Sequence, residues 1–87
     1  MKPKIDDVVY VIVEDQIHKY SVGYLGKQSF VVDGYEWYIH SQFEYDCYNI
    51  TWFKNLEKAK IRLRKEYGRK KIIEIVRGET WGIEEDE

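Results

Sequence analysis

Cysteine is almost absent from this sequence, which contains only Cys47. A single cysteine cannot form an internal disulfide, so we expect a domain of a reducing compartment that depends on its apolar core. The first residues lack the apolar region of a signal peptide, and the longest apolar run, residues 8–13, is far too short to span a bilayer. These absences predict a soluble cytosolic protein with no membrane segment.

Motifs for catalysis, phosphate binding and metal coordination are also missing. The glycines are isolated from one another, so no glycine-rich loop that could cradle a phosphate is visible. His40 and Cys47 bracket one predicted loop but lack the diagnostic context of a nucleophilic site. They also lack the paired short spacing of a structural zinc site, and a metal would need His18, an aspartate or a second copy to complete its ligands. We therefore expect no enzymatic activity, no metal and no cofactor.

Apolar and charged residues are plentiful, and the charge is unevenly distributed. Hydrophobic residues make up 44% of the chain and aromatic residues 16%, which is enough for one core in a domain of 87 residues. Residues 54–71 contain nine Lys and Arg against Glu57 and Glu66, while the rest of the chain contains five against fourteen acids. The net charge of −2 therefore hides a dipolar surface, whose basic side suggests an anionic partner.

The first part of the chain has the pattern of short β-strands. Residues 8–13 are apolar and mostly β-branched on both faces, which predicts a strand that is covered on both sides. In residues 17–25 the side chains alternate, and one face carries His18, Tyr20, Val22 and Tyr24. Gly23 lies within this alternation and predicts a bulge at which the strand bends.

A hairpin is predicted next. Residues 29–32 are followed by Asp33–Gly34, a pair that suits the positive φ angles of a tight two-residue turn. Residues 35–40 form the expected return strand. Residues 41–49 then read as a polar and aromatic loop, and residues 50–53 predict a short strand that leads into a helix.

Residues 55–67 have the spacing of one amphipathic helix. Asn55 is the predicted N-cap, because its side-chain oxygen can accept a free amide of the first turn. Gly68 predicts the end of the helix, since glycine readily adopts the backbone conformation that follows the last turn. The apolar stripe that should face the sheet consists of Leu56, Ala59, Leu63 and Tyr67.

Beyond the helix, residues 71–76 predict a final strand, and we expect Trp81 and Ile83 to pack back on the body. Residues 84–87 form an acidic tail. Short strands at this spacing, together with one helix, predict a single mainly-β α+β domain over residues 1–83. Its expected form is a small, strongly bent antiparallel barrel of five or six strands.

Four motifs in this arrangement resemble one known group of proteins. They are Ile-Asp-Asp-Val-Val-Tyr-Val-Ile at residues 5–12, the Val22–Gly23 pair, Ser-Phe-Val-Val at residues 29–32, and Trp-Phe-Lys-Asn-Leu-Glu-Lys-Ala-Lys at residues 52–60. Over about residues 5–65 the chain is similar to small SH3-like proteins of Firmicute phages and mobile elements. The resemblance implies an SH3-like barrel and a non-enzymatic interaction module of the host cytosol, which could inhibit a defence complex as anti-CRISPR proteins do. This chain departs from the group in having Asn49 where a glycine is common and in its more basic helix.

The basic residues of the predicted helix form one row. Lys58, Arg62, Lys65 and Arg69 recur at intervals of four, three and four, so they lie on one side of the helix, opposite its apolar stripe. The row could contact phosphates or a carboxylate-rich protein surface, or it could be a solvated face that acids of the same molecule neutralise. Ile61 lies near the row. We expect the strand at residues 71–76 to cover it; the alternative is that Ile61 anchors a partner.

Aromatic residues crowd the predicted hairpin and the loop after it: Tyr35, Trp37, Tyr38, Phe43, Tyr45 and Tyr48. Such a density can line a groove for a peptide or provide stacking platforms for bases, although small barrels also fill their cores with aromatic rings. Because alternate residues of a strand face opposite sides, we expect Tyr38 or Tyr45 to remain exposed and available to a partner.

Three functions therefore remain open. The first is a non-enzymatic inhibitor or interaction module that binds a protein or ribonucleoprotein surface, with the acidic clusters outside the helix facing a basic nuclease groove. The second is nucleic-acid binding by the basic helix, against which the acidic pI of about 5.7 argues. The third is a structural accessory protein that pairs with a second copy through a strand edge or the Ile61 region. The expected state is a monomer or a weak homodimer.

Overall fold

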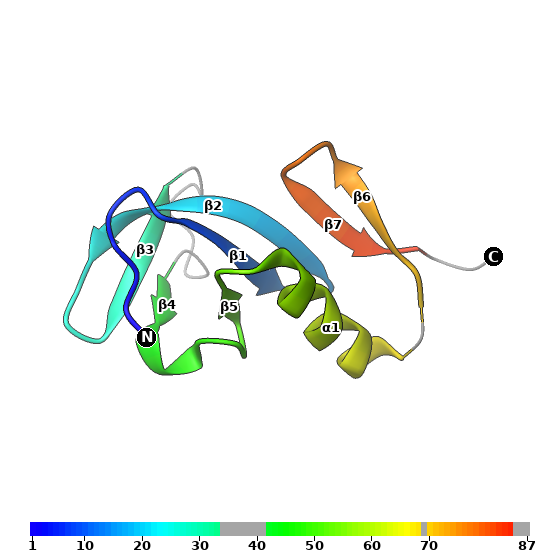
Figure 1. Ribbon diagram of the computed structural model, residues 1–87, viewed down its shortest axis with the longest axis horizontal. Coiled ribbons are helices and arrows are strands. Elements are labelled where there is room, and N and C mark those ends of the chain that lie inside the picture. Colours follow the sequence, from blue (N-terminus) through cyan, green and yellow to red (C-terminus); the bar gives the residue numbers. More distant parts are fainter. Residues whose placement is uncertain (34–41, 69, 85–87) are drawn as a thin grey trace.

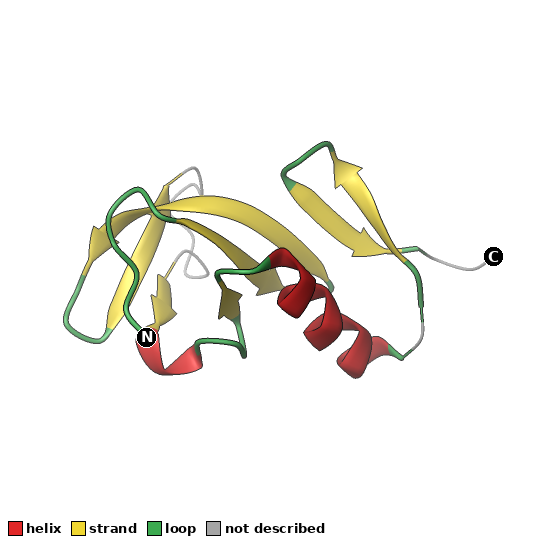
Figure 2. Ribbon diagram, in the orientation of Figure 1, coloured by secondary structure: helices red, strands yellow, loops and turns green. Residues whose placement is uncertain are grey.

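The computed structural model describes residues 1–33, 42–68 and 70–84 (Figure 1). The strands in these residues are β1 (Val8–Val13), β2 (Gln16–Leu25), β3 (Ser29–Asp33), β4 (Gln42–Glu44), β5 (Trp52–Phe53), β6 (Ile72–Val76) and β7 (Thr80–Ile83). The helices are the short 3₁₀ helix η2 (Tyr45–Cys47) and the α-helix α1 (Leu56–Tyr67). Figure 2 shows α1 beside one end of the curled sheet, next to the C-terminal hairpin.

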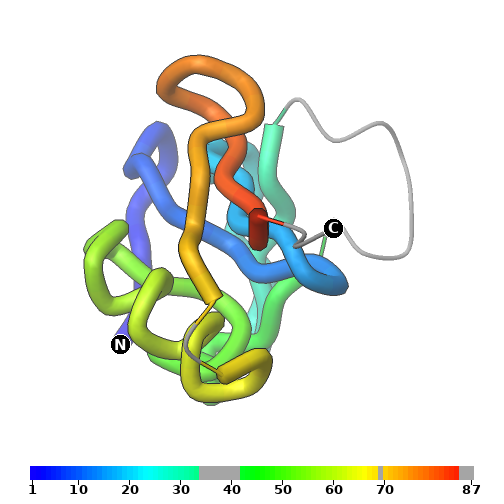
Figure 3. Tube along the Cα trace, turned by 90° about the vertical axis from the view of Figure 1, so that its right-hand side faces the viewer, coloured from blue at the N-terminus to red at the C-terminus, as the bar shows by residue number. Residues whose placement is uncertain are grey.

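The sheet is antiparallel and curls into a half-barrel. Five of its strands follow the order β4-β3-β2-β1-β5, and the hairpin of β6 and β7 joins through β7. The long strand β2 makes this possible, because its first residues pair with β7 and its last residues pair with β3. Seen along the molecule, the turn between β6 and β7 lies at the opposite side from α1 (Figure 3). The expected mainly-β α+β architecture with one amphipathic helix is confirmed.

A bulge at Gly23 bends β2 as predicted. The register against β3 shifts between Val22 and Tyr24. Val22 and Leu25 consequently pack in the same core although they lie three residues apart, whereas Tyr24 is exposed. The expectation that Tyr24 would share a face with Val22 is therefore wrong, because the extra residue reverses the alternation. A side chain at position 23 would meet the carboxylate of Asp33, which would have to shift to make room.

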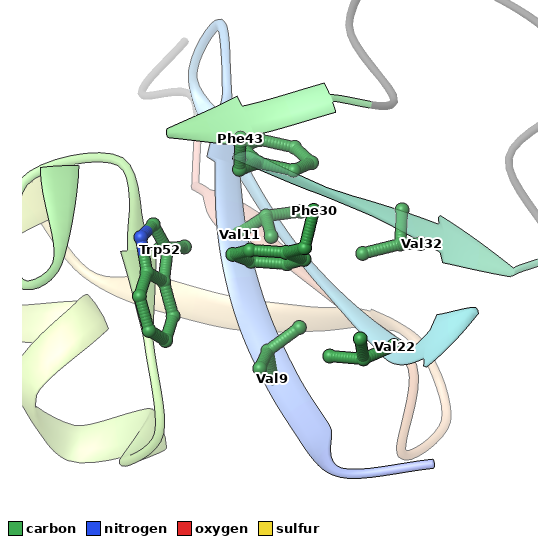
Figure 4. Close-up of a cluster of buried hydrophobic side chains, with 7 residues drawn as sticks. All are labelled: Val9, Val11, Val22, Phe30, Val32, Phe43 and Trp52. Carbon is green, nitrogen blue, oxygen red and sulfur yellow. The ribbon is translucent and has the colours of Figure 1, made fainter. Parts of the chain in front are cut away.

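The main core fills the concave side of the half-barrel (Figure 4). Its buried members are Val9, Val11, Val22, Phe30, Val32, Phe43 and Trp52. Trp52 is fully buried, and its indole and the ring of Phe30 form a T-shaped pair with centroids 4.9 Å apart. The indole nitrogen donates a hydrogen bond of 2.8 Å to the backbone carbonyl of Glu44. Trp52 of β5 is thus bonded to β4, and these are the first and last strands of the half-barrel.

A second core lies between the sheet and α1. It consists of Ile17, Phe53, Ala59, Leu63 and Trp81. Strand β1 contributes to both cores, because Val9 and Val11 face the first while Tyr10 and Ile12 pack against the second. The prediction of a first strand covered on both sides is confirmed. Trp81 and Ile83 also pack back on the body as expected.

Local signals explain the ends of the helix. The side chain of Asn55 accepts a hydrogen bond of 3.1 Å from the Lys58 amide, which confirms it as the N-cap. Gly68 follows the last residue with a φ of 81°, a conformation that favours glycine. Asn49 has a φ of 66° and supplies the left-handed residue of the preceding turn. The predicted bounds of 55–67 agree with α1 to within one residue.

Residues 41–49 were expected to form a loop, and this is wrong for part of the range. Gln42–Glu44 form strand β4, in which Phe43 pairs with Phe30, and a turn of 3₁₀ helix follows. The predicted turn at Asp33–Gly34, the return strand at residues 35–40 and the tail beyond Glu84 lie wholly or partly outside the described residues. None of the helices in the described residues has the length and apolar content of a membrane span.

Candidate functional site

One open groove brings together most of the residues that the sequence predicts to bind a partner. It has a volume of about 320 Å³ and runs along the outer side of α1. The residues that line it are Asn49, Phe53, Lys58, Ile61, Arg62 and Lys65, and we call this site the helix groove. Four of the seven predicted partner-binding residues therefore meet in one place: Lys58, Ile61, Arg62 and Lys65.

The orientation of α1 places this row outward. Ala59 and Leu63 are fully buried against the sheet, so the residues on the other side of the helix face solvent. The left-handed turn at Asn49 returns the chain beside the helix, and Phe53 forms the buried wall of the groove. The sequence predicts only structural roles for Asn49 and Phe53, because nothing in their local pattern reveals which helix face they contact.

Ile61 is 60% exposed. The expectation that the strand at residues 71–76 covers it is wrong. Ile61 follows Ala59 by two residues, which turns it by about 200° round the helix axis and away from the sheet. From β6, only Ile72 packs against the core beneath the helix. An aliphatic side chain therefore lies in water between cations, where a partner could cover it.

The positive charges of the groove are only partly neutralised. Arg62 forms an ion pair with Glu66 one turn later, with 3.5 Å between Nε and Oε1, and its buried Nε has no hydrogen-bond partner in the described residues. A pair of this length at the surface contributes little. Lys58 and Lys65 are exposed and form no ion pair within residues 1–33, 42–68 and 70–84. Arg69, the last member of the predicted row, lies outside the described residues.

Tyr45 is engaged within the fold. Its hydroxyl donates a hydrogen bond of 2.7 Å to the Gly26 carbonyl, and its ring stacks on Phe30 with centroids 6.1 Å apart. The ammonium group of Lys2 lies 5.2 Å from the centroid of the same ring. Tyr45 is thus half-buried and does not line the helix groove. Tyr38 lies outside the described residues.

The residues considered for metal binding do not gather in the described part of the chain. There, no group of three His, Cys, Asp or Glu side chains is placed to hold a metal ion. His18 stacks on Tyr20, and its Nδ1 lies 3.5 Å from the Thr80 hydroxyl. Burial lowers the pKa of His18, because it disfavours the charged imidazolium. Cys47 is a half-buried free thiol, and His40 lies outside the described residues.

Comparisons of this chain with known protein families, with curated proteins and with solved structures find no match. A functional assignment therefore has to come from the chemistry of the helix groove itself.

Proposed function

We propose that this protein is a non-enzymatic interaction module whose helix groove binds an acidic surface of a partner protein. One observation carries the proposal. Ile61, 60% exposed, lies between Lys58 and Lys65, two cations without an ion pair in the described residues. An apolar centre within a charged rim is the usual anatomy of a protein–protein interface.

The partner chemistry follows from complementarity to this surface. We expect the partner to place an apolar side chain on Ile61, because burying Ile61 would recover part of the free energy lost by its exposure. Around that side chain we expect carboxylates, which would pair with Lys58, Arg62 and Lys65. Opposite charges on the two proteins would also raise the association rate at low salt. The partner segment is therefore an apolar anchor flanked by Asp or Glu.

A protein partner fits the groove better than a nucleic acid. Phosphate oxygens are contacted by cations and by neutral hydrogen-bond donors, and an exposed aliphatic side chain among them has no counterpart on a phosphate backbone. The net charge of −2 also opposes the approach of a long polyanion to the rest of the molecule.

A finer form of the proposal comes from the resemblance to small proteins of phages and mobile elements. In that form the partner is a defence ribonucleoprotein of the bacterial host, which the chain inhibits by occupying a surface that the complex needs. Its test is the activity of such a complex with and without the purified chain. Unchanged nuclease activity at saturating concentrations would remove the finer form and leave the coarser one intact.

The direct test compares affinity capture by four tagged proteins. They are the wild type, Ile61→Asp, the double variant Lys58→Glu with Lys65→Glu, and the control Arg64→Glu, which changes an exposed cation outside the groove. We expect one stoichiometric protein to be retained by the wild type and the control and lost from both groove variants. Equal capture by all four would refute the proposal. A partner that disappears after nuclease treatment would support nucleic-acid binding instead.

A further inference from the structure

Strand β6 forms an edge of the sheet. In the described residues β6 pairs with β7 alone, while β7 pairs with both β6 and β2. Figure 1 shows β7 between β6 and the long strand β2. The backbone N–H and C=O groups on the outer side of β6 therefore have no ladder partner among these residues. Such an edge is a template for another strand.

The direction of these groups follows from the ladder between β6 and β7. The Glu84 amide donates a hydrogen bond of 2.8 Å to the Lys71 carbonyl. In an antiparallel pair the bonded residues alternate, so Ile73, like Lys71, directs its backbone groups at β7. Ile72 and Glu74 consequently direct their N–H and C=O groups outward. These two residues are the positions at which an added strand would bond.

The face of β6 opposite the second core is apolar and exposed. Ile73, Ile75 and Val76 are 37%, 50% and 47% exposed. A register shift between Glu74 and Val76 places Ile75 over Gly82, where a side chain would collide with it. Ile73 and Val76 lie opposite Gly82 and Thr80, so the three aliphatic side chains share one face. An added strand would shield this face from water.

Cations flank the edge. Lys70 and Lys71 precede β6 and Arg77 follows it, all three exposed and without an ion pair in the described residues. The acids near these cations are Glu74, in the middle of the strand, Glu79, in the turn, and Glu84, whose backbone bonds to Lys71. Each end of the edge thus has exposed cations, Lys70 and Lys71 at one end and Arg77 at the other, and the outer face is aliphatic.

This pattern disfavours a second copy of the chain as the added strand. If two β6 strands paired antiparallel along their whole length, Glu74 would lie opposite Glu74 and Lys71 opposite Arg77. Like charges directly opposite each other are destabilising. The bulge at Ile75 interrupts the edge for any added strand, so the charge pattern is what disfavours a second copy.

We propose that β6 binds an extended segment of a partner protein as an additional β-strand. The segment has β-branched apolar residues that pack on Ile73 and Ile75, and Asp or Glu near its ends that meet Lys70, Lys71 and Arg77. Main-chain hydrogen bonds to Ile72 and Glu74 supply affinity, and the flanking charges supply selectivity. This surface is separate from the helix groove and does not depend on the function proposed for that groove.

A labelled synthetic peptide tests the proposal. Its sequence is a central Val-Thr-Val-Thr-Val run between two pairs of glutamates, and a matched peptide has lysines in place of the glutamates. Fluorescence anisotropy with the whole protein should show saturable binding of the acidic peptide, at least about tenfold tighter than the basic one. The double variant Lys71→Glu with Arg77→Glu should reverse this preference. The control variant Lys27→Glu with Arg64→Glu, which has the same change in charge and alters exposed cations outside both β6 and the helix groove, should bind the acidic peptide as the wild type does.

Hydrogen exchange then locates the bound strand. On adding the acidic peptide, the amides of Ile72 and Glu74 should exchange more slowly, whereas that of Ile73, which faces β7, should not change. Absence of saturable binding, or an unchanged preference in the Lys71→Glu, Arg77→Glu variant, would overturn the proposal. So would sedimentation as a dimer in which both outward amides are already protected, because a second copy would then occupy the edge.

Discussion

Ile61 leaves 60% of its surface in water, although Ala59 and Leu63 on the other side of the same helix are fully buried. The fold therefore obtains its helix–sheet contact from Ala59 and Leu63, and Ile61 adds little to it. Removing exposed apolar surface changes the stability of a domain only slightly, whereas removing a buried leucine leaves a cavity.

The variants Ile61→Ser and Leu63→Ala should therefore differ in the free energy of unfolding. We expect Ile61→Ser to change the free energy of unfolding by less than about 0.5 kcal/mol and to abolish capture of the partner. Leu63→Ala should cost about 2–5 kcal/mol. Urea unfolding followed by tryptophan fluorescence measures both. A large loss of stability in Ile61→Ser would mean that the side chain is buried in the folded protein.

His18 should make stability depend on pH. Burial lowers its pKa in the folded protein below the ordinary value of 6.5. Between the two pKa values the unfolded chain binds more protons than the folded one, so stability rises with pH in this window. The contribution is fully present above about pH 6.5 and is lost as the pH falls through 6.5 to the folded-state pKa.

We therefore expect the free energy of unfolding to fall when the pH is lowered from about 8 to about 5.5, and this part of the dependence to be missing in His18→Gln. Urea titrations of both proteins across the range are the measurement. A wild type and a variant with parallel pH profiles would contradict the assignment to His18.

At the scale of elements, the sequence reveals features that neighbouring residues determine. It does not reveal features that contacts between distant segments determine. The helix was predicted to within one residue because its cap at Asn55 and its stop at Gly68 are local. Strand β4 was missed because three residues carry no period of their own, and Gln42–Glu44 become a strand only by pairing with β3. The bulge at Gly23 was predicted, yet its effect on Tyr24 was not.

In the candidate site, too, the sequence reveals the local pattern but not the effect of distant contacts. The row of Lys58, Arg62 and Lys65 could be read from helical spacing, whereas the exposure of Ile61 depends on where the C-terminal hairpin docks. Because β7 pairs with β2, the hairpin covers the side of α1 near Trp81 and leaves Ile61 uncovered. Docking of this kind is decided by contacts between distant segments, which a period along the chain does not encode.

The charge of α1 should control binding without controlling the fold. In Lys58→Glu with Lys65→Glu, two exposed cations of the groove are reversed. We expect at least about a tenfold loss of affinity for the acidic partner, with a change in unfolding free energy below about 1 kcal/mol. Affinity in the wild type should also decrease with salt, since surface charges are screened. If Arg64→Glu weakens binding as much, net charge matters and the groove does not.

At the scale of the whole molecule, two cores share the sheet. The first fills the half-barrel, and the second depends on the C-terminal hairpin because Trp81 closes it beneath α1. The ring of Trp81 meets that of Tyr10 edge-on, with centroids 5.9 Å apart. The hairpin thus joins the folding unit, although β6 itself is mostly exposed.

Trp81→Ala should destabilise the whole domain by about 3 kcal/mol or more, because a large buried ring is replaced by a cavity. We expect one cooperative transition at a lower urea midpoint. An unfolding curve in which the half-barrel keeps the wild-type midpoint while the hairpin detaches would show that the second core is not part of the cooperative unit.

We propose above all that a protein partner covers Ile61 in the helix groove. Replacing Ile61 by the photo-crosslinking residue p-benzoylphenylalanine in the cell that produces the protein tests this most directly, with the exposed Tyr24 of β2 as the control position. We expect one major protein adduct on illumination at position 61 and none at position 24. Adducts to nucleic acid alone, or the same products from both positions, would contradict it.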